Sequence, residues 1–291
     1  MVKKDSLLDR GNSFYSGETV YFVTKHGKEG IVAPLFSELG ISCCRIDVDT
    51  DCFGTFSGEV ERTGSVRETL RRKIEAGATA LPECRLFLAS EGSFGPDPYV
   101  GFLRTDLESL LLWDRKLNSE IYAEYLCRSP MHDEVMICAD SEIRSFLEKI
   151  SFPEHAIIVR PSDSYALVFK GLLTEGEVRS AVEKCAAASP RGEVLIATDL
   201  RANFNKTRRA AIAKAAESLI QKLCSLCPAC TVPGFWISRG IPGLPCEWCG
   251  EPSSAPIAVL FSCVICDYTE ERPRPDGRTT LQAAECGYCN P

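Results

Sequence analysis

The sequence predicts an α/β protein in which a mixed sheet is flanked by helices and followed by a zinc-binding module. Strand-like runs alternate with amphipathic helical segments as far as Cys224. Beyond that point four Cys-x2-Cys pairs replace the alternation. The composition, with 45% apolar and 25% charged residues, excludes a disordered chain and a membrane protein. We therefore expect an α/β domain at 1–225 and a zinc module at 226–291.

Each element of the α/β domain follows from a local pattern. Runs of β-branched and aromatic residues bounded by turn residues predict strands at 19–24, 41–48, 85–89, 156–159, 165–169 and 193–197, and a hairpin at 108–126. Apolar residues spaced along one face predict helices at 31–39, 65–77, 141–150, 174–185 and 207–224. Gly40 ends the first helix, and capping boxes at Ser65 and Thr174 open two others.

The cysteine pairs predict two zinc ions. They are Cys227/Cys230, Cys246/Cys249, Cys263/Cys266 and Cys286/Cys289. Two such pairs supply the four thiolates of one tetrahedral site, so eight cysteines imply two closed, structural sites. Pairing in sequence order and a nested arrangement, in which the middle pairs share one zinc and the outer pairs the other, both remain open. The strand-like residues 257–269 favour nesting.

The net charge and the search for sorting signals restrict the kinds of partner that the sequence predicts. Residues 1–6 contain no apolar run, and no stretch approaches the length of a membrane span, so we expect a cytoplasmic protein without membrane contact. In that reducing compartment, disulfides are a weak alternative to metal. The net charge of −7 disfavours RNA and DNA, although residues 201–222 are locally basic. The sequence also lacks the motifs of Walker-type ATPases, dinucleotide enzymes and zincin proteases.

Polar residues that follow the predicted strands outline a candidate phosphate site. The loop after the first strand holds Thr24, Lys25, His26 and Lys28, and its glycines lead into a helix N-terminus. Backbone N–H groups and two ammonium groups there could cradle a phosphate. A solvated strand–helix loop is the alternative explanation.

Carboxylates after later strands are candidate magnesium ligands. Asp49, Asp51 and Glu59 follow the second strand, where closely spaced carboxylates can bind a hard cation. Glu91 follows the third strand, and Asp199 and Arg201 follow the last. The resulting hypothesis is a Mg-dependent hydrolase of a small phosphorylated substrate. Its catalytic residues would be Glu91, Asp199 and His26, with Thr24, Lys25, Lys28 and Arg201 on the phosphates and Asp49, Asp51 and Glu59 on the metal. The competing hypothesis is a nucleic-acid-binding or protein-interaction module that uses the zinc ribbons and the basic 201–222 helix.

Two resemblances accompany these patterns. The motifs at 24–28, 49–56, 89–96 and 198–202 and the closing Cys-x2-Cys-Asn-Pro resemble an uncharacterised bacterial family of unknown function over nearly the whole chain. Residues 19–125 more distantly resemble the inosine/xanthosine triphosphatases, through the loop 24–28, Ser57 to Val60, Glu68-Thr69 and Glu91 to Ser93. The second resemblance implies hydrolysis of a nucleotide. The sequence departs from that family at His26, Lys28 and Ser93.

Overall fold

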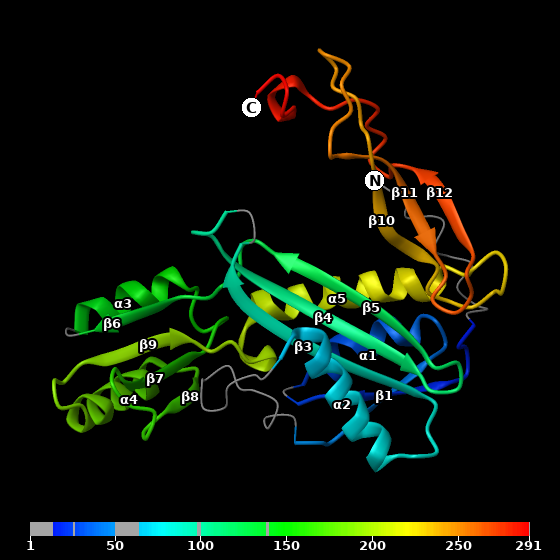
Figure 1. The fold of residues 1–291 in the computed structure, drawn as a ribbon. Coiled ribbons are helices and arrows are strands. Elements are labelled where there is room, and N and C mark those ends of the chain that lie inside the picture. Colours follow the sequence, from blue (N-terminus) through cyan, green and yellow to red (C-terminus); the bar gives the residue numbers. More distant parts are fainter. Residues whose placement is uncertain (1–13, 26, 50–63, 98–99, 138–139, 291) are drawn as a thin grey trace.

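The fold consists of three sheets, two in a body that ends with residue 224 and one in an arm built from residues 225–290 (Figure 1). It is seen in a computed structural model that describes residues 14–25, 27–49, 64–97, 100–137 and 140–290. The expected mixed α/β class and its C-terminal cysteine clusters are confirmed. Within the described residues, no helix has both the length and the apolar character needed to cross a bilayer.

The first sheet has the strand order β2-β1-β3-β4-β5. Its strands are β1 (Thr19–Val23), β2 (Ser42–Ile46), β3 (Leu86–Pro96), β4 (Arg104–Asp114) and β5 (Ser119–Cys127). β1 is parallel to both β2 and β3, whereas β3, β4 and β5 pair antiparallel, so the sheet is mixed. Because β3 runs past the end of β1, the edge of β3 beyond residue 89 has no partner strand in β1.

Helices cover both faces of this sheet because its strands alternate apolar side chains between the two faces. Leu88 and Leu110 face α1 (Glu29–Ser37) and α5 (Lys206–Cys224) in one core. Phe87 and Leu111 face α2 (Val66–Ala80) in another. The capping box predicted at Ser65 is present at the start of α2.

The second sheet has the order β6-β9-β7-β8 and is antiparallel throughout. It comprises β6 (Glu134–Ile137), β7 (Ile157–Pro161), β8 (Phe169–Leu172) and β9 (Val194–Thr198), with α3 (Asp140–Lys149) and α4 (Glu175–Ala188) around a separate core. The capping box at Thr174 opens α4 as predicted. The sequence did not indicate that these strands leave the first sheet.

Several strands differ from the sequence predictions. β3 continues to Pro96 rather than ending at Ala89, because it pairs with β4 over its whole length. The strand predicted at 165–169 lies at Phe169–Leu172 instead, since Tyr165 belongs to a loop where Arg160 lies 4.2 Å over its ring. β6 and β10 (Trp236–Pro242) were not predicted.

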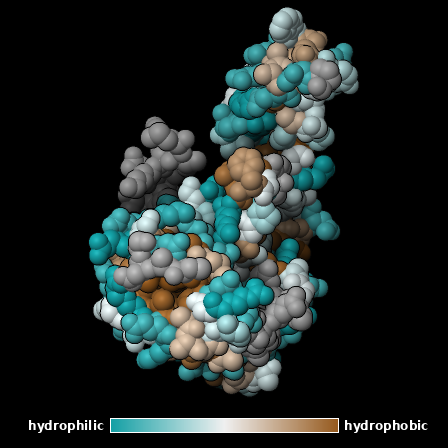
Figure 2. All heavy atoms as spheres, turned by 90° about the vertical axis from the view of Figure 1, so that its left-hand side faces the viewer, coloured by the Kyte–Doolittle hydropathy of each residue, from teal (hydrophilic) through white to brown (hydrophobic). Residues whose placement is uncertain are grey.

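The arm is joined to the body at the end of α5. It contains the antiparallel strands β10, β11 (Pro256–Ser262) and β12 (Thr269–Pro273). Gly234 packs so closely against β5 that an added Cβ would lie 3.1 Å from Ile121. Lys222 donates a hydrogen bond to the Tyr122 carbonyl at 2.7 Å. The space-filling view shows the rest of the arm standing clear of the body (Figure 2).

Candidate functional site

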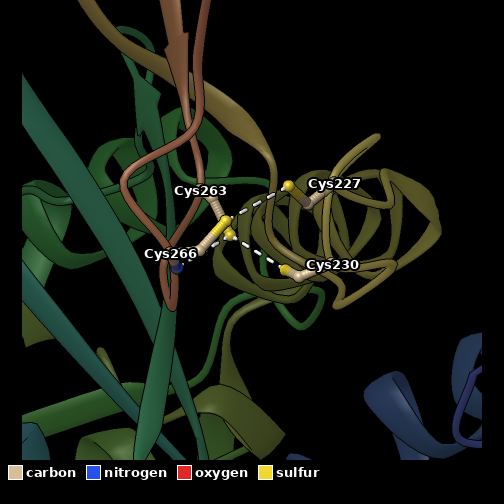
Figure 3. Close-up of side chains that lie close together, drawn as sticks. All are labelled: Cys227, Cys230, Cys263 and Cys266. Carbon is tan, nitrogen blue, oxygen red and sulfur yellow. Dashed lines mark hydrogen bonds between the residues drawn. The ribbon is translucent and has the colours of Figure 1, made fainter.

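The eight knuckle cysteines form two groups of four. The proximal site, next to the body, contains Cys227, Cys230, Cys263 and Cys266, and the distal site contains Cys246, Cys249, Cys286 and Cys289 (Figure 3 shows the proximal site). The ligand atoms of each group all lie within 4.8 Å of one another. Both groups could therefore hold a metal ion.

The observed pairing is neither of the two arrangements that the sequence left open. The first knuckle pairs with the third and the second with the fourth, so the sites interleave. The reason is strand direction: β10, β11 and β12 are antiparallel, and each carries the chain to the opposite end of the sheet. Successive knuckles therefore alternate between the two ends. Spacing alone cannot show this, because it does not reveal which end of the sheet a knuckle occupies.

The sulfur positions are those expected for tetrahedral zinc. Four sulfurs at about 2.3 Å from a zinc ion lie about 3.8 Å from one another. The Cys227–Cys266 and Cys230–Cys263 sulfurs are 3.7 and 3.5 Å apart. In the distal site, the Cys246–Cys289 and Cys249–Cys286 sulfurs are each 3.8 Å apart.

Backbone N–H groups donate to cysteine sulfurs in both sites. The N–H groups of Cys249 and Trp248 lower the pKa of the Cys246 thiol to about 7. In the proximal site, the N–H of Ile265 donates to the Cys263 sulfur at 3.3 Å. All four positions of each tetrahedron are occupied by protein ligands, so neither site offers a place for substrate.

A second constellation is a cluster of buried charges in the body, at the end of β1. Lys28, at the start of α1, donates from Nζ to Ser90 Oγ at 3.0 Å. Lys73, from α2 on the other face of the sheet, donates to the Ser90 carbonyl at 3.2 Å and forms an ion pair with Glu91. Lys28, Lys73 and Glu91 are all buried. The pKa of Lys28 is lowered to about 8, mainly by burial; the charge of Glu108 opposes this shift and the charge of Arg208 supports it.

Next to these lysines lies a buried ion pair between Glu108 of β4 and Arg208 of α5. The Arg208 Nε and Glu108 Oε1 atoms are 2.5 Å apart, and each side chain is only 1% exposed. Arg208 also donates to the Leu200 carbonyl and lies over the ring of Phe94. Gly92 faces Glu108 in the strand register. The pair thus ties α5 to β4, and the contact with Phe94 ties Arg208 to the part of β3 that extends past β1.

Asp106 lies two residues before Glu108, on the same face of β4. It is 1% exposed, and neither of its carboxylate oxygens has a hydrogen-bond partner among the described residues. Burial raises the pKa of Asp106 to about 7, and the charge of Glu108 adds to the shift. Perturbed groups of this kind gather at functional sites.

The raised pKa of Asp106 predicts that the protein loses stability as pH rises. The folded state holds the Asp106 proton up to about pH 7, whereas the unfolded state releases it near 3.8. Between these values the folded state binds more protons, so the free energy of unfolding falls with increasing pH. Asp106→Asn should remove this fall, which amounts to about 3 kcal/mol between pH 5 and pH 8. Urea titrations at pH 5 and pH 8 measure the change, and parallel wild-type and variant profiles would contradict it.

The structure places the sequence-predicted site residues in separate groups. Lys28 and Glu91 lie in the buried cluster, and Glu91 is inside β3 rather than beyond its end. Lys25 forms an ion pair with Asp49 at 2.5 Å, close to Thr24, whose hydroxyl donates to the Lys25 carbonyl. His26, Asp51 and Glu59 lie outside the described residues.

Asp199 and Arg201 come from the end of the second sheet. The Asp199 carboxylate is fully buried and pairs with Arg201, with an Oδ2–Nη2 distance of 2.6 Å. Arg201 in turn lies 4.4 Å over the ring of Phe204. Asp199 and Arg201 therefore pair with each other just after the end of β9 in the second sheet.

Sequence reasoning missed Lys73, Asp106, Glu108 and Arg208. A signal for two of them existed: Asp106 and Glu108 share the strand face of Leu110 and Leu112, which belong to the core. Charged residues in phase with core leucines are buried, and buried charges need partners.

The basic segment 201–222 is largely neutralised within the body. Four of its charges have acidic partners: Arg201 with Asp199, Lys206 with Glu154, Arg208 with Glu108 and Lys214 with Glu217. Lys222 is bound to the Tyr122 carbonyl. The segment therefore offers little free positive charge to a nucleic-acid backbone.

Fold and sites together define a mixed α/β protein that carries two interleaved four-cysteine clusters on a C-terminal arm. The chain belongs to the family described as "Domain of unknown function (DUF6671)", whose model matches residues 76–291. That match includes Glu91, Glu108, Arg208 and the knuckle cysteines, and it begins after Lys28 and Lys73.

Comparisons with individual proteins add little. No curated protein matches the sequence. Among solved structures, the crystal structure of protein VC0702 from Vibrio cholerae is similar at 8% identity, with a TM-score of 0.33, and the similarity covers 70% of this chain and 93% of that one. Similarity at that level carries neither a fold nor an activity to this chain.

Proposed function

We propose that the body is a metal-dependent hydrolase of phosphate esters or anhydrides, with its site where β1 ends. The observation that supports this most is the meeting of Lys28 and Lys73 at Ser90, from opposite faces of the sheet. Two buried ammonium groups repel each other unless anions lie near them. Glu91 supplies one such negative charge to Lys73, and a bound phosphate would supply another beside Lys28.

The residues of this cluster suit distinct roles. Lys28 and Lys73 would hold the phosphate oxygens. Because the pKa of Lys28 is lowered to about 8, its ammonium can also give a proton to a leaving oxygen near neutral pH. Glu91 would exchange its ion pair with Lys73 for the metal. A bound magnesium ion would polarise the phosphoryl group and lower the pKa of a coordinated water.

A neighbouring pocket could hold the organic part of such a substrate. It is lined by His132, Arg160, Tyr165 and Leu200, among others. The Leu200 carbonyl accepts a hydrogen bond from Arg208, and the ring of His132 lies 5.3 Å from that of Phe94. Leu200 and Phe94 therefore connect the pocket to the charged cluster, because Arg208 contacts both of them.

We also infer that the metal in both four-cysteine sites is zinc. The all-thiolate ligand set, its sulfur spacing and the lack of an open ligand position support a structural role for it. Zinc would stabilise the arm, and the chemistry would belong to the body.

Glu91→Gln should lower phosphate release at least about 100-fold, because the amide cannot replace a carboxylate metal ligand. Release is measured with magnesium present, for a set of nucleoside triphosphates, pyrophosphate and p-nitrophenyl phosphate. Lys28→Met should raise KM for the same substrates, since it removes a charge that binds the phosphate.

A matched control is Glu120→Gln. Glu120 also pairs with a basic residue of α2, Arg71 at 2.7 Å, but it lies at the turn end of β5, opposite Trp113, whereas Glu91 lies opposite Ser109. It should leave phosphate release unchanged. The proposal would be refuted if the wild-type protein released phosphate from none of these substrates. Full activity of Glu91→Gln would also refute it.

A further inference from the structure

The distal four-cysteine site presents two exposed aromatic side chains. Trp248 and Tyr288 are 81% and 71% exposed. Each stands immediately before the second cysteine of its knuckle, and the two knuckles meet at one metal site. Both residues belong to the tip of the arm, the segment around the distal site, which lies far from the body near the C-terminus (Figure 1).

The fold fixes the backbone of Trp248, but the described residues make no ring contact with either aromatic side chain. The N–H of Trp248 donates to the Cys246 sulfur at 3.4 Å, which fixes the backbone beneath the ring. Among the described residues, neither ring makes an aromatic or cation–π contact, whereas Phe235 and Phe261 of the same arm make several. An exposed tryptophan on a rigid support is typical of a recognition surface.

The tip is negatively charged. Its two arginines are engaged in ion pairs, Arg274 with Asp276 and Arg278 with Glu285. Glu247 and Glu251, on either side of Trp248, are exposed, and neither forms a salt bridge with a described residue. A zinc ion held by four thiolates adds a formal charge of about −2.

We propose that the tip of the arm binds a basic, extended protein segment. An arginine or lysine of the partner would lie over the Trp248 ring, where the ring quadrupole attracts a cation, and would reach Glu247 or Glu251. Tyr288 would cover the next side chain of the segment. A phosphate backbone would be repelled by the same carboxylates, and so would the tip of a second copy of this chain.

Binding of a fluorescent peptide of twelve alternating arginine and serine residues tests the proposal. The zinc-loaded full chain is titrated by fluorescence anisotropy at low and physiological salt. Affinity should fall as salt rises, because the attraction is partly electrostatic. Trp248→Ala should weaken binding about tenfold. The double variant Glu247→Gln, Glu251→Gln should also weaken it and flatten the salt dependence.

The control variant is Phe102→Ala, which removes an 88% exposed aromatic ring from the body and should leave binding unchanged. Zinc content and circular dichroism establish that each variant is folded. The proposal is overturned if the peptide does not bind or if Trp248→Ala binds as the wild type does. It is also overturned if the full chain binds oligouridine of the same length, or associates with itself, and Trp248→Ala abolishes that interaction.

Discussion

Removing one zinc ligand from the proximal site should destabilise the body, whereas the same change in the distal site should not. The wild-type chain should contain two zinc ions, and Cys227→Ser and Cys249→Ser one each. Loss of a structural zinc removes roughly 10 kcal/mol of metal-binding free energy from the segment it organises. For the distal site, that segment is the tip alone.

The difference arises from the contacts of the proximal site. Val264, between two of its ligands, lies 3.2 Å from the position of an added Gly234 Cβ, and Ile121 of the body lies 3.1 Å from it. Loosening the proximal site therefore uncovers the edge of the first sheet. Hydrogen exchange should show faster exchange in β5 for Cys227→Ser only. Equal changes in both variants would show that arm and body unfold as one unit.

The second large effect is expected from adding a single methyl group at Gly92 in β3. A Cβ at Gly92 would lie 2.5 Å from Arg208 Nη2 and 2.7 Å from Glu108 Oε1. Neither group has space to retreat, because both side chains are 1% exposed. Gly92→Ala should therefore separate a buried ion pair, which costs about 3–5 kcal/mol.

Gly95→Ala is the control for this prediction. It lies in the same strand, and no atom lies within 4 Å of its added Cβ. Urea unfolding should show a large loss for Gly92→Ala and almost none for Gly95→Ala. Similar losses for the two variants would mean that strand propensity, rather than the ion pair, sets the cost.

The features that sequence predicted well are local ones. The capping boxes at Ser65 and Thr174 depend on residues three apart, and both are present. The Cys-x2-Cys knuckles were recognised as metal ligands for the same reason, and they form two groups of four cysteines. Each of these features is complete within a few residues, so no knowledge of the tertiary fold is needed.

The features that sequence missed depend on which strands become neighbours. The order of zinc pairing follows from the antiparallel course of β10, β11 and β12, and β10 was not predicted. Likewise, the buried partner of Glu108 is Arg208 of α5, which lies 100 residues later in the chain. The candidate site was expected at the strand ends of one sheet. Asp199 instead follows β9 of the second sheet, while Glu91 lies within β3 of the first.

The interleaved pairing also determines when the arm can mature during synthesis. The first knuckle has to wait until Cys266 has left the ribosome, and by then Cys246 and Cys249 are already exposed as an unmatched pair of thiols. That pair is completed only by Cys286 and Cys289, the last of the four knuckles. A chain that stops between Cys266 and Cys286 leaves the reactive thiols of Cys246 and Cys249 without the other two ligands of their metal site. The arm therefore cannot be divided into two smaller zinc domains by any single cut.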